Sequence, residues 1–371
     1  MRPMSGQISF RSFTILVIFF TIGTTILIAP SGLATVAGQD AWIASAIGIA
    51  ANVAMVAGYA LLGNRHADQS IVEFGETLLG KWIGKPAGLL FGLYCYLLAA
   101  LMVGDLGYFL TTQTMVETPI ESLQVLFVVV IVIAVKAGMD AYVRAADIFF
   151  PWFVLLFVVL FLTLLPKFDV RQLQPPVEYG FSPILEAAFS FFSLQELGVL
   201  LMLYPYVKKG KGRSRAFLSG TLIGGFVLVA TTIGSIGVLS YVQVANHLFP
   251  TYVMAKNISI GQFLQRMEGL LMLIWILSIF VKVTLTFHAS VLGISQIFRL
   301  DERALVWPFA IGMVVLSLMC YTNAVYVQNF LATIWSPFTS TFMVAYPALL
   351  LLLSYVRNFR EPASVRRTEK K

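Results

Sequence analysis

Charged residues are scarce in this chain of 371 residues, because Asp, Glu, Lys and Arg together make up only 12% of it. Soluble domains carry roughly 25%, so the composition excludes an ordinary soluble protein. Hydrophobic side chains account for 58% of the chain, including 30 Phe, 14 Tyr and 6 Trp, and the mean hydropathy is +0.85. The composition therefore predicts an integral membrane protein that resides in a lipid bilayer.

Cysteine is almost absent as well, with Cys95 and Cys320 both inside apolar runs. Two such residues give neither a disulfide framework nor a metal-binding spacing. The sequence also lacks a P-loop, a GxGxxG fingerprint, a catalytic triad and a His/Cys cluster. We therefore expect no enzyme activity, no metal and no other cofactor. The net charge of +7 does not predict nucleic-acid binding, because the basic residues lie in short loops and the tail.

Long apolar runs dominate the rest of the sequence. Runs of about 20 residues mark helices that cross a bilayer. The first, at 13–29, is longer than a signal-peptide core of about 7–15 residues, so we expect it to be a retained helix. The predicted fold is all-α, one transmembrane domain over 1–371 with a cytoplasmic tail at 357–371. The ten predicted spans are 10–36, 41–62, 86–112, 123–137, 142–165, 183–205, 216–241, 267–297, 304–321 and 328–356.

The basic residues in the connections indicate the orientation. Lys and Arg accumulate in short cytoplasmic loops, and here 20 of them fall on one predicted side. The other side holds four, Lys167, Arg171, Lys256 and Arg266. This split predicts both termini in the cytoplasm, which agrees with an even number of spans.

Three connections between the predicted spans are longer than turns. Residues 71–80 are expected to form a short helix on the cytoplasmic surface. Residues 167–182 contain Pro175-Pro176 and are expected to form an extended outer loop. Residues 241–266 mix polar and apolar side chains, which predicts either an outer lid that partly enters the protein or a plain solvated loop.

The first span contains an interruption at Gly23-Thr24-Thr25, followed by Pro30. Unsatisfied backbone groups cost several kcal/mol in lipid, so broken helices persist only where they are buried or line a cavity. Broken helices that bind small polar ligands are typical of one transporter architecture. The alternative is an ordinary spanning helix that tolerates Gly and Pro.

A second interruption lies at 190–198, in the sixth span, and includes Glu196. Ten spans divide into two halves of five, at about 10–165 and 183–356, and each half then begins with an interrupted helix. Matching interruptions in two halves are the best sequence indicator of a ligand site at mid-membrane.

Two ionisable residues lie where a membrane span should be apolar. Lys282 falls near the middle of the eighth span, and Glu196 is its natural partner. Intramembrane charges are rare and are either functional or paired. Lys282 could replace a coupling cation, hold a ligand carboxylate, or form a structural ion pair. Glu196 could instead accept a ligand ammonium group or a proton.

Other polar residues in the spans carry weaker predictions. Asp105 in the third span is either deep or hydrated near the outer surface. His288, six residues after Lys282, is more typical of a packed helix histidine than of a proton relay. Tyr94 and Tyr96 either line the pocket or pack in the core.

With these residues in view, the run from Gly23 to Pro30 resembles the Gly-x-Gly-x-x-x-x-Pro first helix of the amino acid–polyamine–organocation transporters. The whole chain, over 7–358, more closely resembles the permease-like B subunit of bacterial spore germinant receptors. One departure is Thr25, where transporters often have a second Gly, and its side chain narrows the site. The matching features are Ile8-Ser9, the run 21–30, Asp40-Ala41-Trp42-Ile43, Leu79-Gly80-Lys81-Trp82-Ile83-Gly84, Glu196 followed by Tyr204-Pro205-Tyr206-Val207-Lys208-Lys209, and Arg266-Met267-Glu268 before Trp275 and Lys282.

The resemblance implies a LeuT-like 5+5 inverted repeat of ten helices, with helices 1 and 6 discontinuous. It also implies the inner membrane of a spore, a larger A-type membrane subunit and a C-type lipoprotein subunit as partners, and a nutrient ligand, usually an amino acid. Carried over by position, the ligand-binding residues would be Gly23, Thr24, Thr25, Tyr94, Leu98, Glu196, Leu197 and Lys282.

The expected function is a nutrient-sensing subunit that binds a small zwitterion at the broken helices and signals to its partner subunits. Backbone N–H groups at the Gly23–Thr25 break would hold the ligand carboxylate at the positive end of a helix. The alternatives are a proton-coupled amino-acid transporter that uses Lys282 or Glu196, and a structural scaffold with a degenerate pocket.

Overall fold

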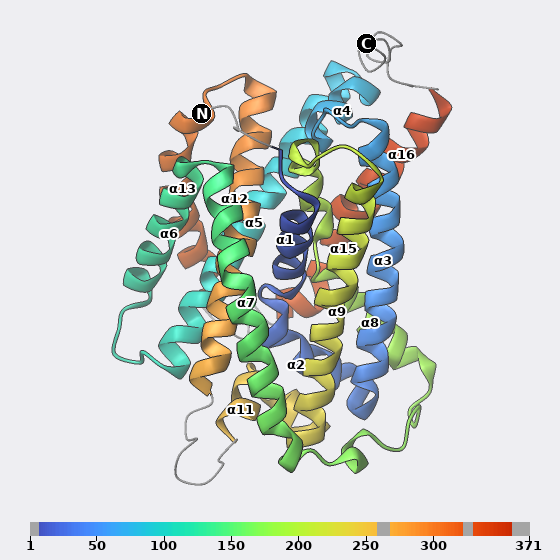
Figure 1. Ribbon diagram of the computed structural model, residues 1–371, viewed down its shortest axis with the longest axis vertical. Coiled ribbons are helices and arrows are strands. Elements are labelled where there is room, and N and C mark those ends of the chain that lie inside the picture. The colour runs from blue at the N-terminus through green and yellow to red at the C-terminus, as the bar shows by residue number, and fades with distance from the viewer. Residues whose placement is uncertain (1–6, 258–267, 322–328, 358–371) are drawn as a thin grey trace.

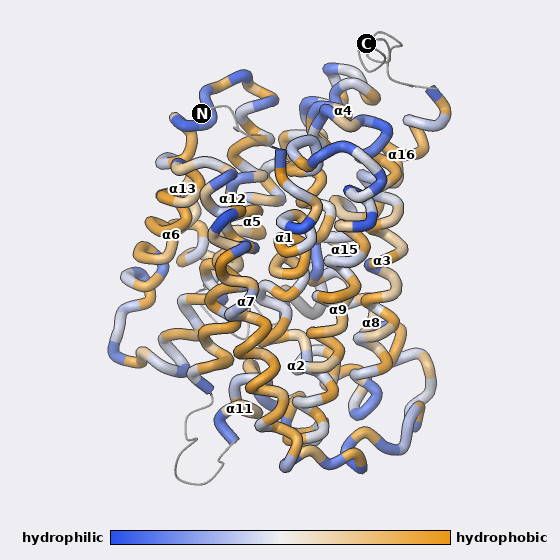
Figure 2. Tube along the Cα trace, viewed as in Figure 1, coloured by the Kyte–Doolittle hydropathy of each residue, from blue (hydrophilic) through white to orange (hydrophobic). Residues whose placement is uncertain are grey.

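The computed structural model describes residues 7–257, 268–321 and 329–357. Within these ranges the chain is helical, and the only β-type pairing is an isolated parallel bridge between Ile8 and Val207. Nine helical stretches of the described residues are long and apolar enough to cross a membrane. Figure 2 shows the apolar residues along these helices and the polar residues mostly at the two ends of the molecule. The prediction of an all-α, multi-pass membrane protein is confirmed.

The long helices form one upright bundle (Figure 1). The central helix α12 packs against α1, α5, α7 and α13, and every residue from Val281 to Ser295 is buried. Helices α6, α7 and α13 expose apolar side chains such as Ile133, Trp152 and Ile311, as expected for surfaces that face lipid. The bounds of the long helices are α3 (Ala41–Arg65), α5 (Lys81–Gln113), α6 (Ile120–Ala137), α7 (Met139–Leu164), α9 (Lys211–Leu239), α12 (Glu268–Phe298) and α13 (Glu302–Cys320).

The first predicted span is divided into two short helices, α1 (Phe10–Ile22) and α2 (Thr25–Ala37). Each has 13 residues and is therefore about 20 Å long, less than the bilayer core of about 30 Å. In Figure 1, α1 lies in the upper half of the bundle and α2 in the lower half, so together they cross it. Helix α2 meets α3 through the short helix η1 (Gly38–Asp40), at a positive φ of 58° on Gly38. The nine long stretches join α2 and α3 into one and leave out the shorter α1. When α1 and α2 are instead counted as one broken span and α3 as the next, the described residues contain ten spans.

Gly23 makes the break between α1 and α2 possible. Its φ of 26° lies in a region that L side chains rarely adopt. Its N–H still donates to the Phe19 carbonyl over 2.8 Å, which ends α1 with a normal helical hydrogen bond. A Cβ atom placed on Gly23 would lie only 2.1 Å from Cδ of Lys282. Backbone conformation and packing both require glycine at this position.

The sixth predicted span is interrupted in the same way. Helix α8 (Phe181–Ser193) ends, and the 3₁₀-helix η4 (Leu197–Met202) begins only after Glu196. Glu196 has the left-handed conformation, with φ 41° and ψ 34°, which is uncommon for a residue that carries a side chain. The predicted interruptions of the first and sixth spans are both confirmed.

The connections also agree with the sequence in most respects. The expected surface helix at 71–80 is α4 (Ile71–Leu79), which begins with a capping box formed by Ser70 and Glu73. The expected outer loop at 167–182 begins at the end of the 3₁₀-helix η2 (Leu165–Lys167) and contains a second one, η3 (Val170–Leu173). The expected lid begins with α10 (Tyr241–Asn246) and α11 (Pro250–Lys256). The part of the lid at 258–266 lies outside the described residues.

The described part of the lid enters the protein. Thr251, Met254 and Ala255 of α11 are fully buried, and the Thr251 hydroxyl donates to the Ile26 carbonyl of α2 over 2.8 Å. A plain solvated loop would leave these side chains exposed, so α11 favours the lid over the alternative. Helix α11 therefore packs directly beyond the first helix break.

The tenth span consists of a π-helical turn η6 (Leu331–Trp335), α15 (Ser336–Ser340), a second π-helical turn η7 (Thr341–Ala345) and α16 (Tyr346–Val356). Arg357, directly after α16, donates from Nη1 to the Leu78 carbonyl of α4 over 2.6 Å. The start of α1 and the end of α16 therefore lie at the same end of the bundle (Figure 1). This placement is the one that an even number of spans requires.

Gly23→Ala should destabilise the protein by about 2–4 kcal/mol, because it combines a strained φ with overpacking against Lys282. Gly32→Ala is the matched control, since Gly32 lies in α2 and a Cβ there would meet nothing within 4 Å. The control should be neutral or slightly stabilising, because Ala favours helix over Gly. Thermal unfolding of both variants in detergent or nanodiscs measures the difference, and equal midpoints would contradict the described break.

Candidate functional site

A buried ion pair lies where the two helix breaks meet. Lys282 of α12 places its Nζ 2.7 Å from Oε2 of Glu196, which is the left-handed residue of the second break. The two side chains are 1% and 3% exposed. The structure thus brings together the two intramembrane charges that the sequence predicts to be partners.

The second break supplies another oxygen atom to the same ammonium group. The Leu194 carbonyl, just beyond the end of α8, accepts from Lys282 Nζ over 3.2 Å. It also accepts from the Thr25 hydroxyl of α2 over 3.3 Å. The C-terminal end of a helix carries partial negative charge, so α8 itself contributes to holding the ammonium. Side chains from α12 and α2 thus donate hydrogen bonds to a carbonyl that the break leaves without a partner in its own helix.

The first break surrounds the aliphatic part of Lys282. The Ser278 hydroxyl of α12 shares its hydrogen between the Gly23 carbonyl, at 3.3 Å, and the Trp275 carbonyl of its own helix, at 2.9 Å. The methylene groups of Lys282 occupy the space left by the missing side chain of Gly23. The ring of Phe20 lies 5.3 Å from Nζ, within the range of a cation–π interaction. Four of the predicted site residues, Gly23, Thr25, Glu196 and Lys282, therefore form one contiguous cluster.

Two further predicted residues belong to the breaks by their position in the chain. Thr24 lies between Gly23 and α2 and is 7% exposed, while Leu197 begins η4 and is 1% exposed. None of the hydrogen bonds described for this part of the chain involves the Thr24 side chain.

The remaining two predicted residues, Tyr94 and Leu98, lie on α5. Tyr94 donates to the Thr339 hydroxyl over 3.3 Å, and its ring stacks on Phe342 at 4.6 Å and on Trp335 at 6.0 Å. Leu98 is buried one turn further along α5. Leu98 belongs to the same apolar core as Ile22 and Leu197, which flank the two breaks.

The structure adds two polar residues that the sequence analysis did not select, Trp335 of η6 and Gln195. Gln195 is fully buried between Leu194 and Glu196, and neither its Oε1 nor its Nε2 has a hydrogen-bond partner among the described residues. The indole N–H of Trp335 interacts with the Glu196 carboxylate, but outside the geometry of an ordinary hydrogen bond. Buried polar groups without partners cost about 1–3 kcal/mol each. Such groups are expected where a polar ligand completes the hydrogen bonding.

Asp105 and His288 have partners away from the two breaks. The Tyr321 hydroxyl donates to the Asp105 carboxylate. His288 lies between Tyr142 of α7 and Glu302 of α13, with its Nδ1 2.6 Å from the Tyr142 hydroxyl and its Nε2 2.7 Å from Oε1 of Glu302. His288 therefore links three helices through hydrogen bonds and is not simply packed among apolar side chains.

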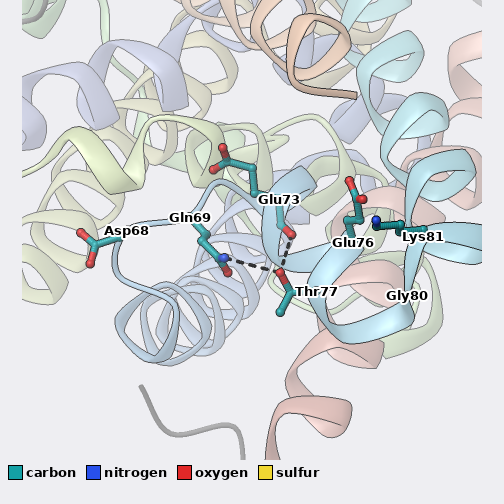
Figure 3. A pocket seen from close by; sticks show the side chains of 7 residues that line it. All are labelled: Asp68, Gln69, Glu73, Glu76, Thr77, Gly80 and Lys81. Atoms are coloured by element: carbon teal, nitrogen blue, oxygen red, sulfur yellow. Dashed lines mark hydrogen bonds between the residues drawn. The ribbon is translucent and has the colours of Figure 1, made fainter. Parts of the chain in front are cut away.

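A surface cavity of about 430 Å³ lies beside α4, at the end of the bundle where the chain begins (Figure 3). It is polar, but two of its carboxylates have structural roles. Asp68 forms an ion pair with Lys209 at 2.7 Å, and Glu73 accepts from the Ser70 N–H in the capping box. The cavity is separate from the helix breaks and contains none of the predicted site residues. Its lining residues are Asp68, Gln69, Glu73, Glu76, Thr77, Gly80 and Lys81.

Comparison with solved structures shows the fold to which this bundle belongs. The structure of MhsT in complex with L-phenylalanine matches with a TM-score of 0.70 and 14% identity, over 92% of this chain and 88% of MhsT. Mhp1, a nucleobase-cation-symport-1 family transporter in a closed conformation with bromovinylhydantoin bound, matches with a TM-score of 0.68 and 14% identity. That match covers 93% of this chain and 78% of Mhp1. The predicted LeuT-like fold with discontinuous first and sixth helices is confirmed.

Comparison of the sequence identifies relatives along almost the whole chain. Spore germination protein KB of Bacillus subtilis (strain 168) is 28% identical over 324 residues, 86% of this chain and 86% of the relative. Spore germination protein YndE of the same strain is 26% identical over 360 residues, 94% of this chain and 97% of the relative. The family described as spore germination protein matches residues 7–327. This multi-pass, transporter-like membrane protein therefore belongs to the spore germination protein family.

Proposed function

We propose that this protein is the nutrient-sensing B-type subunit of a spore germinant receptor, and that it binds an amino acid at the two helix breaks. The observation that carries the proposal is the buried pair of Lys282 and Glu196 at the meeting point of the breaks. Its two charges match the two charges of a zwitterion. Family membership supports the germination role, and MhsT, which has the same fold, is solved in complex with an amino acid.

Binding requires the charged groups to exchange partners. In the described conformation the pair is closed, because Lys282 and Glu196 are buried and bonded to each other. The ammonium of a zwitterion would bind Glu196 and the Leu194 carbonyl. Its carboxylate would bind Lys282 and the N–H groups at the start of α2, where the helix end is positive. One internal pair is replaced by two ligand pairs, so no net charge is added to the membrane interior.

This exchange gives a binding signal that other subunits can detect. A ligand shifts a conformational equilibrium only through its different affinity for the two states. The closed state is stabilised by the Lys282–Glu196 bond, and the bound state by ligand contacts at the same two residues. We propose that the halves 10–165 and 183–356 rearrange when the bond opens, and that A-type and C-type subunits respond. The protein would act in the spore inner membrane with both termini cytoplasmic.

The second candidate function is a proton-coupled amino-acid transporter. The observation that favours it is the match to Mhp1, which is a transporter with the same fold. Glu196 would then be the residue that exchanges a proton. The sensor and the transporter use the same site, so they differ in whether solute crosses the membrane.

Amino acids should stabilise the purified protein. A ligand at 100 times its Kd adds about 2.7 kcal/mol to the stability of the folded state, so the unfolding midpoint should rise by several degrees with at least one amino acid in a complete panel. Lys282→Met should abolish this response. The matched control ligand is the N-acetyl amide of the same amino acid, which lacks both charges. Failure of every zwitterion to stabilise the wild type would refute the assignment of this site.

The ion pair should show strong coupling in a double-mutant cycle. Lys282→Met leaves a buried carboxylate without its partner and should cost about 3–5 kcal/mol, whereas neutralising both partners of a buried pair is often close to neutral. The double variant Glu196→Gln/Lys282→Met should therefore recover much of the stability that Lys282→Met loses. The unfolding midpoints of the wild type, both single variants and the double variant measure this coupling. Additive losses would show that the two side chains act independently.

Uptake of labelled amino acids separates the sensor from the transporter. Proteoliposomes that contain this chain alone should show no accumulation when a proton gradient is imposed, even with an amino acid that stabilises the protein. Lys282→Met proteoliposomes provide the background. Proton-driven accumulation above that background would show that the protein is a transporter and would contradict the proposed sensor function.

A further inference from the structure

The ammonium group of Lys282 occupies a site built from oxygen atoms. A carboxylate oxygen of Glu196 lies at 2.7 Å and the main-chain carbonyl oxygen of Leu194 at 3.2 Å. The carbonyl lies at the C-terminal end of α8, where the helix carries partial negative charge. In broken-helix transporters, unwound carbonyls and the C-terminal ends of half-helices coordinate Na⁺ or a proton. The donor set around Nζ is therefore suited to a small monovalent cation.

The rest of the Lys282 side chain occupies a notch in the first break. A Cβ on Gly23 would lie 2.1 Å from Cδ, 3.1 Å from Cγ and 3.2 Å from Cβ of Lys282. The notch therefore exists only because Gly23 has no side chain. Removal of the Lys282 side chain beyond Cβ would leave a passage beside Gly23 that ends at the two oxygen atoms.

The charge balance of the site requires one cation. Glu196 is 3% exposed at its side chain, and an isolated carboxylate in the membrane interior is costly. Among the described residues, Lys282 is the only cation that forms an ion pair with Glu196. A protein without this lysine would have to take up a proton or a free cation at the same position.

We propose that this is a monovalent-cation site whose cation, in the closed conformation without a ligand, is supplied by the chain itself in the form of Lys282. The wild-type protein then needs neither Na⁺ nor K⁺ at this position. Truncation of the lysine opens the site to a free cation. This proposal concerns the closed conformation alone, and so it does not depend on which nutrient, if any, later displaces Lys282 from these oxygen atoms.

Chemical rescue of Lys282→Ala tests the proposal. The truncation removes Cγ, Cδ, Cε and Nζ, which together correspond to propylammonium. The thermal midpoint of the purified variant is measured with increasing propylammonium, sodium or potassium chloride. Tetramethylammonium chloride at equal ionic strength is the reference, because this cation is bulky and has no N–H group. At least one of the three test cations should reverse most of the decrease in the thermal midpoint, and this effect should saturate as the concentration of the cation rises.

Three proteins serve as controls for the rescue. The double variant Glu196→Gln/Lys282→Ala should not respond, because the charge that holds the cation is gone. Lys85→Ala should not respond either, although Lys85 also donates to a main-chain carbonyl, that of Ile297, over 3.4 Å. The wild type should have the same midpoint in sodium, potassium and tetramethylammonium chloride.

Two results would overturn the proposal. One is a Lys282→Ala variant whose thermal midpoint rises no more with any of the three test cations than with tetramethylammonium. The other is a wild type that Na⁺ or K⁺ stabilises specifically over tetramethylammonium, and this measurement decides the question if the variant cannot be purified.

Discussion

The central constraint on this structure is that backbone groups released by a helix break must find partners inside the membrane. Each break meets this requirement with side chains from another helix. The Leu194 carbonyl of the second break accepts from Lys282 and Thr25, and the Gly23 carbonyl of the first break accepts from Ser278. The two breaks are therefore not independent irregularities. They are held together by α12, which contributes both Ser278 and Lys282.

The same arrangement determines the charge distribution of the interior. An ammonium group brought to the Leu194 carbonyl needs a nearby anion, and Glu196 provides it only because the break turns its backbone into the left-handed region. Gly23, in turn, must lack a side chain so that the methylene groups of Lys282 can lie beside it and bring the ammonium to Glu196. Conformation, packing and charge at this point are thus interdependent, and a change in any one of these residues affects the others. A ligand that binds here therefore acts on both broken helices at once.

Much of the fold and part of the candidate site could be predicted from the sequence, for a simple physical reason. A charge or a polar run is conspicuous inside an apolar span, and this made Gly23, Glu196 and Lys282 visible. Trp335 is not visible in this way, because a tryptophan in an apolar span is typical of core packing or of an interface. The partnership of His288 with Glu302 also depends on how helices far apart in sequence are packed. Whether any of the eight predicted residues contacts a ligand stays a prediction.

The complete burial of α12 from Val281 to Ser295 has a mechanical consequence. Lys282 and His288 are six residues apart on this helix, hence about 9 Å apart along its axis. A rigid, tightly packed helix transmits displacement over such a distance, because protein interiors have low compressibility. A shift or rotation of α12 that separates Lys282 from Glu196 would also displace His288 from Tyr142 and Glu302. The helix therefore couples the middle of the bundle to the contacts among α7, α12 and α13 nearer the end where the chain begins.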